Sequence, residues 1–80
     1  MIAKSLNDKN LSQMKPGQKS RVVKVTGGGQ IKRRIMEMGL VPGVEIEMER
    51  YAPLGDPIEV KMTGQHLSLR MEEAERVVVE

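Results

Sequence analysis

Two segments of strict apolar–polar alternation constrain the fold of this chain more than any other feature. The segments are VEIEMER, residues 44–50, and IEVKMT, residues 58–63. A period of two is typical of a strand with one buried face, and two such strands in succession form an antiparallel pair. The residues expected to face the core are Val44, Ile46, Met48, Ile58, Val60 and Met62.

The rest of the chain predicts further short elements. Strands are expected at residues 19–25, 66–70 and 77–79, a helix at 30–38 and one helical turn at 71–76. In the first strand, alternation places Val23 and Val25 on one face and Val22 on the other. Five short strands around an aliphatic core, with one inserted helix, indicate a mainly β fold that closes as a small, strongly bent barrel.

The end of the predicted helix is marked by its residue types. Ile31, Ile35 and Met38 follow the i, i+4, i+7 spacing of a buried helical stripe. Gly39 falls at the C′ position, where glycine adopts the left-handed conformation at low cost. Leu40 is then placed to contact Ile35.

Residues 1–10 are polar, and we interpret them as a flexible arm in front of a single domain at residues 11–80. Leu11 and Met14 are expected to point inward from a short turn that precedes the first strand. The chain begins with no apolar signal segment and contains no apolar run near the ~20 residues of a membrane helix. We therefore expect a soluble, cytoplasmic protein.

Composition excludes several classes of function. With 80 residues and no cysteine, the chain has a small core and no disulfide framework. The net charge of +2 and the single aromatic residue, Tyr51, argue against nucleic-acid binding, which favours a concentrated basic face and stacking side chains.

Three glycines before a basic helix suggest a phosphate-binding loop, but their spacing does not fit one. The dinucleotide motif G-x-G-x-x-G needs a third glycine where Lys32 stands after Gly27 and Gly29. The P-loop motif also fails from either Gly27 or Gly28. We interpret the glycines as a hinge between strand and helix, at which a stray anion could still bind beside Lys32 and Arg33.

Catalytic and metal-binding residues are sparse. His66 is the only histidine and is expected to face outward on a strand, where it could join one or two glutamates in a weak divalent-metal site. No nucleophile–base spacing is present and no deep pocket is expected. The sequence therefore predicts a protein that is not an enzyme and carries no cofactor.

Two exposed segments are candidates for partner binding. On the helix, Lys32, Arg33 and Met36 are expected to point outward, and Met and Arg are both suited to protein interfaces. In the turn PLGDP, residues 53–57, Leu54 lies between two prolines, where it could dock on a partner or fold back on the barrel; Asp56 belongs to the same candidate site.

Four segments taken in order carry a resemblance to a known family. MKPGQKSRVVKVTGGG, RRIMEMGLVPG, APLGDPIEVK and HLSLRMEEAERVVVE resemble the FeoA family of bacterial ferrous iron transport accessory proteins. The match runs from about Leu11 to Val79, with MGLVPG and the pair GDPIEV and HLSLR as its most specific parts. Gln65 departs from the tyrosine that the family often has there.

The resemblance implies an SH3-like barrel and a role beside FeoB, the membrane ferrous iron transporter with a cytosolic GTP-binding domain. On this view the chain docks on the cytosolic part of the transporter and modulates its assembly or activity. A similar domain stands at the C-terminus of the diphtheria-toxin-repressor-type metal regulators. The alternative to the transport role is therefore a metal-responsive sensor domain. Because PxxP peptides dock on aromatic-lined grooves, we expect no PxxP binding.

Overall fold

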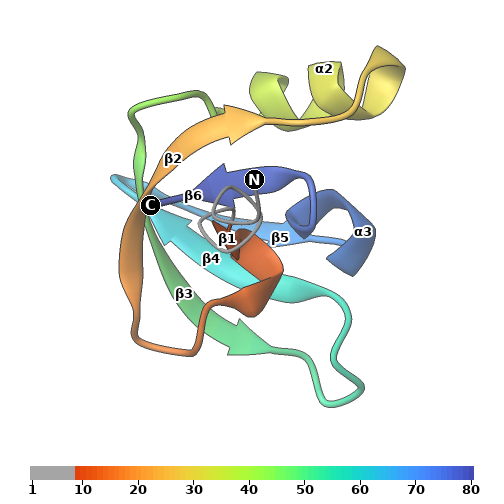
Figure 1. The fold of residues 1–80 in the computed structure, drawn as a ribbon. Helices are drawn as coiled ribbons and strands as arrows, with labels where there is room; N and C mark the ends of the chain where they lie inside the picture. The colour runs from red at the N-terminus through yellow and green to blue at the C-terminus, as the bar shows by residue number, and fades with distance from the viewer. Residues whose placement is uncertain (1–8) are drawn as a thin grey trace, which may run out of the picture.

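The fold is mainly β, as the sequence predicts. The computed structural model describes residues 9–80, which form one antiparallel sheet in the strand order β1-β6-β2-β3-β4-β5. Figure 1 shows the strongly curved sheet, with α2 at one end and α3 at its side. Along the chain the elements are β1 (Lys9–Asn10), the 3₁₀ turn η1 (Leu11–Gln13), β2 (Lys19–Val25), α2 (Gly29–Glu37), β3 (Glu45–Tyr51), β4 (Ile58–Met62), β5 (Gln65–Leu69), α3 (Met71–Ala74) and β6 (Val77–Val79).

The alternating segments form the central strands β3 and β4 with the predicted faces. Glu47 pairs with Lys61, and Lys61 pairs in turn with His66 of β5. The buried core is aliphatic, and it includes the inward residues of both alternating segments except Val44, which is half-buried. Leu11 and Met14 are also fully buried, so both predictions are confirmed.

The sheet has a sixth strand that the sequence did not reveal. Lys9 and Asn10 form β1 and pair with Val79 and Val78 of β6. These two residues belong to the predicted arm, whose residues 1–8 lie outside the part of the chain that the structure describes. Two residues are too few to show an alternation, so only the pairing partner identifies this strand.

The alternation predicted for β2 is wrong at one point. Val22 and Val25 are both buried, whereas Val23 is 45% exposed. The pairing register between β2 and β6 shifts between Val22 and Lys24. An extra residue in one strand reverses the faces beyond it, so this irregularity turns Val23 outward and returns Val25 to the core.

The end of α2 confirms its sequence signals. Gly39 has a φ of 101°, a backbone conformation that side chains with a Cβ rarely adopt. The Gly39 N–H donates to the Met36 carbonyl at 3.0 Å, and the Leu40 N–H donates to the Ile35 carbonyl at 3.4 Å. These two hydrogen bonds form the Schellman motif. After this turn, the Leu40 side chain lies in the core with no exposed surface.

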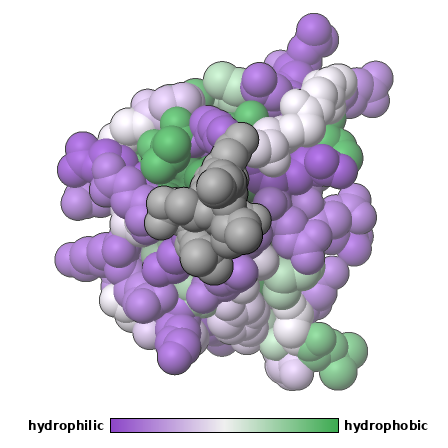
Figure 2. All heavy atoms as spheres, viewed as in Figure 1, coloured by the Kyte–Doolittle hydropathy of each residue, from purple (hydrophilic) through white to green (hydrophobic). Residues whose placement is uncertain are grey.

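Tyr51, the single aromatic residue, ties the beginning of the domain to the sheet. Its hydroxyl lies 2.9 Å from the carbonyl oxygen of Ser12 and within bonding distance of the Met14 carbonyl. Most of the surface seen in Figure 2 is hydrophilic. In residues 9–80, neither helix has the length and apolar character to cross a membrane.

Candidate interaction surface

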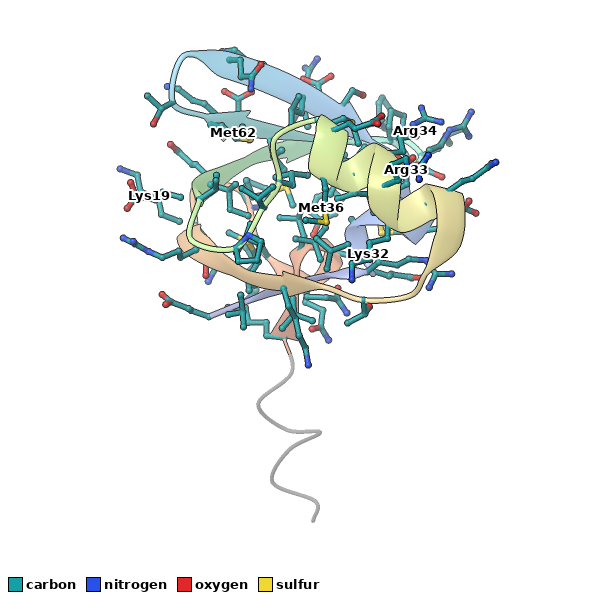
Figure 3. The ribbon with its side chains drawn as sticks, turned by 90° about the horizontal axis from the view of Figure 1, so that it is seen from above. Lys19, Lys32, Arg33, Arg34, Met36 and Met62 are labelled. Carbon is teal, nitrogen blue, oxygen red and sulfur yellow. The ribbon has the colours of Figure 1, made fainter. Side chains whose placement is uncertain are left out.

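Helix α2 presents a basic outer surface. Lys32 and Arg33 are exposed, as predicted. Figure 3 shows Lys32 directed toward the β2 side of the helix, with Arg33 and Arg34 on the other side. Since successive helical residues are ~100° apart, the basic residues cover two flanks of α2 rather than one.

Met36 does not point outward as the sequence predicted. It is half-buried and packs against the hydrophobic core, and Figure 3 shows it between α2 and β2. Met36 follows Lys32 by one helical turn, and its flexible side chain reaches around the flank of α2. This packing depends on where β2 lies in the fold, and the spacing of residues along a helix does not predict that position.

A buried carboxylate connects α2 to α3. Glu73 is 6% exposed, and its Oε2 lies 3.4 Å from Arg34 Nε. Its Oε1 accepts a hydrogen bond from the Arg70 backbone N–H at 3.0 Å. Arg34 is therefore occupied by an internal partner, whereas neighbouring Arg33 is in no ion pair within residues 9–80.

The turn between β3 and β4 displays Leu54 to solvent. The side chain is 95% exposed, which decides against the fold-back alternative. The Ala52 N–H donates to the Pro57 carbonyl at 2.9 Å, and the Gly55 N–H donates to the Ala52 carbonyl at 2.7 Å. These bonds close the turn, so Leu54 stands at the tip of a defined loop.

Asp56 has a structural role that the sequence did not reveal. Its Oδ1 accepts a hydrogen bond from the Met71 backbone N–H at 3.0 Å. Met71 is the first residue of α3, and the first N–H groups of a helix lack partners within the helix. Asp56 thus caps α3 from a distant turn, which no local sequence signal could show.

The glycine segment forms a fixed strand-to-helix connection. Gly27 has a φ of 82°, and a Cβ built on it would lie 2.5 Å from Arg76 Nη1. The Thr26 N–H and hydroxyl both donate to the Arg76 carbonyl, at 2.7 and 3.2 Å. The glycines therefore serve the backbone path from β2 into α2.

His66 is exposed on β5, as predicted, and contacts one carboxylate. Its Nδ1 lies 2.8 Å from Glu49 Oε1. Across residues 9–80, no group of three or more His, Asp or Glu side chains could hold a metal ion. A protein zinc site uses three or four ligands, so Glu49 and His66 alone do not fit a resident zinc ion.

A small open hollow lies beside the central strands, at the end of the molecule that carries the β4–β5 turn. It has a volume of about 250 Å³ and is lined by Lys19, Lys61 and Glu47 around the buried side chains of Ile46 and Met62. Figure 3 shows Lys19 and Met62 well away from Arg33. The lining mixes charges of both signs and contains no His, Ser or paired base that would indicate catalysis.

Comparison with known proteins identifies a family. The family model described as "FeoA domain" matches residues 9–80. A curated relative from Porphyromonas gingivalis, the Fe(2+) transport protein A/Fe(2+) transporter FeoB fusion protein, is 39% identical over 70 residues. Those residues are 88% of this chain, and the chain spans only 8% of the length of that relative.

Solved structures of FeoA proteins share the fold. The FeoA-like protein of Clostridium acetobutylicum is 38% identical with a TM-score of 0.85, covering 92% of this chain and 86% of that one. Zinc-complexed FeoA of Stenotrophomonas maltophilia, described as an SH3 domain protein, is 33% identical with a TM-score of 0.78, covering 90% and 89% of the two chains.

The same fold also occurs in a manganese-dependent transcriptional repressor. That protein is 16% identical to this chain with a TM-score of 0.83, and the match covers 91% of this chain and 36% of the repressor. At this identity the likeness shows the fold alone, so it adds nothing to the alternative of a metal-responsive sensor domain.

Proposed function

The chain belongs to the FeoA domain family, and we propose that it is a non-enzymatic accessory module of ferrous iron uptake that docks on the cytosolic part of a FeoB-type transporter. Docking would modulate the assembly or activity of the transporter. The module works in the cytoplasm, through its surface, with no resident cofactor and at most weak divalent-metal binding at His66.

The observation that carries this proposal is the fusion protein of Porphyromonas gingivalis. There, a segment 39% identical to this chain is joined in one polypeptide to a FeoB transporter. A covalent connection holds a module beside its partner at an effective concentration that reaches the millimolar range for short linkers. A module on a separate chain has no such link, so it needs surface contacts to stay beside the transporter.

The exposed residues of this chain suit such contacts. Lys32 and Arg33 provide cations that are in no ion pair within residues 9–80, and Leu54 provides an apolar side chain at a loop tip. Arg is enriched at protein interfaces. Met36 and Asp56 complete the predicted contact set, although the structure gives each an internal partner.

A direct binding measurement tests the proposal. The full chain is titrated against the full-length FeoB-type transporter of the same organism, held in lipid nanodiscs, and association is followed by biolayer interferometry. We expect saturable binding in the micromolar range or tighter, as for a specific interface of ordinary size. An unrelated multi-span transporter in nanodiscs is the control. Absence of saturation up to the highest soluble concentration would refute the proposed function.

A further inference from the structure

The two predicted docking segments lie on the same side of the molecule, with α3 between them. Figure 1 shows α2, α3 and the β3–β4 turn following one another along one side. Internal contacts connect the three. Arg34 of α2 pairs with Glu73 of α3, and Asp56 of the turn bonds the Met71 N–H of α3.

We propose that the β3–β4 turn, α3 and the outer side of α2 form one docking surface, in which Leu54 is the apolar anchor and Arg33 and Arg70 are the charge contacts. The surface fits a partner that presents an apolar pocket for Leu54 with carboxylates to one side. This inference rests on the proposed function, because the partner surface belongs to the transporter.

The charges along this side determine the chemistry of the partner. Asp56 and Glu73 have their carboxylates in internal hydrogen bonds. Arg33 and Arg70 are exposed and take part in none of the ion pairs of residues 9–80. The exposed acids of this stretch are Glu37, one helical turn after Arg33 in α2, Asp56 in the turn, and Glu72 and Glu75 in and just after α3. A complementary partner surface therefore places carboxylates opposite Arg33 and Arg70, and neutral or cationic groups opposite these exposed acids.

Leu54 has the properties of an interface anchor. In residues 9–80 only Val23 and Leu54 are large hydrophobic residues with exposed side chains, and Leu54 is 95% exposed. A single exposed leucine is ordinary by itself. Here, however, two backbone hydrogen bonds close the turn. A third hydrogen bond, from the Met71 N–H to the Asp56 side chain, fixes the turn against α3. A loop whose backbone is fixed before binding loses less conformational freedom when its side chain enters a pocket.

The size of the surface fits a single partner. A standard interface takes about 800 Å² from each protein, against an accessible surface of 5253 Å² for this chain, so one interface covers roughly 15% of it. The molecule measures 35 × 25 × 24 Å, and one side of it supplies that area.

Asp56 acts in this surface as a positioning residue. Its carboxylate accepts a hydrogen bond from the Met71 N–H of α3. This bond fixes the turn that carries Leu54, so Asp56 orients Leu54 instead of contacting the partner. Asp56→Ala removes the bond, whereas Asp56→Asn keeps a side-chain oxygen that can accept it.

Binding to the full-length transporter in nanodiscs tests the inference with matched variants. We expect Leu54→Ser to weaken binding at least tenfold, as for loss of a central anchor. Arg33→Glu should weaken it about tenfold, while Lys19→Glu, which changes an exposed lysine well away from Arg33 (Figure 3), changes it less than about twofold. Asp56→Ala should weaken binding in the wild-type background but add less than about twofold to Leu54→Ser, and Asp56→Asn should bind like the wild type.

Each other outcome overturns the inference in an identifiable way. Unchanged binding of Leu54→Ser would show that Leu54 is not the anchor. Equal effects of Lys19→Glu and Arg33→Glu would show that the side carrying Arg33 is not the docking surface. An additive effect of Asp56→Ala on Leu54→Ser means that Asp56 itself contacts the partner. If the wild-type chain does not bind, the proposed function and this inference fail together. Circular dichroism and urea midpoints of every variant establish that the fold is intact.

Discussion

At the scale of single residues, the glycine segment offers the sharpest test of the structure. Gly27 has a φ of 82°, whereas the next residue, Gly28, is extended at −141°. We expect Gly27→Ala to lower the free energy of unfolding by ~1–2 kcal/mol, the cost of a left-handed residue with a Cβ. Part of the contact with Arg76 Nη1 is relieved by movement of that flexible side chain.

Gly28→Ala is the matched control for this prediction. No atom lies within 4 Å of a Cβ built on Gly28, and its conformation is open to any residue. The substitution restricts the unfolded chain, which stabilises by about 0.4–1 kcal/mol, but Gly28 is the N-cap of α2, where alanine is less favourable than glycine. We therefore expect the two effects to offset each other and the net change to be smaller than that of Gly27→Ala. Urea unfolding followed by circular dichroism measures both variants. Equal effects at the two positions would contradict the backbone path described for this connection.

At the scale of elements, the contact between α2 and α3 depends on one ion pair with a buried acid. Arg34→Ala leaves the Glu73 carboxylate, 6% exposed, without its cation. Loss of one partner of a buried charge is costly, but Arg34 is itself largely exposed and solvent screens the pair. We expect a loss of about 1–2 kcal/mol in the free energy of unfolding.

Arg33→Ala removes the same kind of side chain from the adjacent position and is the control. Arg33 is exposed with no internal ion pair, so its loss should change stability by less than ~0.5 kcal/mol. In the Arg34→Ala background, Glu73→Gln should cost less than it does alone, because the two residues are coupled. Strict additivity in urea unfolding would show that Arg34 and Glu73 act independently.

The elements also show which sequence signals suffice and which do not. The alternation in β3 and β4 and the glycine after α2 are local, because one strand face or one helix end determines each pattern. The irregularity in β2, the two-residue β1 and the inward packing of Met36 depend on neighbouring strands. The candidate site divides in the same way. The exposure of Lys32 and Arg33 was predicted correctly, but the sequence left open whether Leu54 docks on a partner or folds back. The hydrogen bond from α3 to Asp56 was not predictable from local pattern.

At the scale of the whole molecule, charge is nearly balanced, with 13 basic and 11 acidic residues. Long-range attraction to a partner therefore comes from the distribution of charge and not from its sum. Asp56 and Glu73 each accept an internal hydrogen bond, and Arg33 and Arg70 are exposed on one side among the exposed acids Glu37, Glu72 and Glu75. This side should guide encounter, whereas Leu54 should control how long the complex persists.

These two contributions separate in binding kinetics with the transporter. Between about 0.01 M and about 0.1 M salt the Debye length falls from ~30 to ~10 Å, so the association rate constant of the wild type should fall several-fold. Arg33→Glu should lower that rate constant at low salt and flatten its dependence on salt. Leu54→Ser should leave the salt dependence as it is and raise the dissociation rate constant at least tenfold. Stopped-flow or interferometry traces at several salt concentrations measure both rate constants. An identical salt dependence of the association rate constant for the wild type and Arg33→Glu would show that this side of α2 does not face the partner.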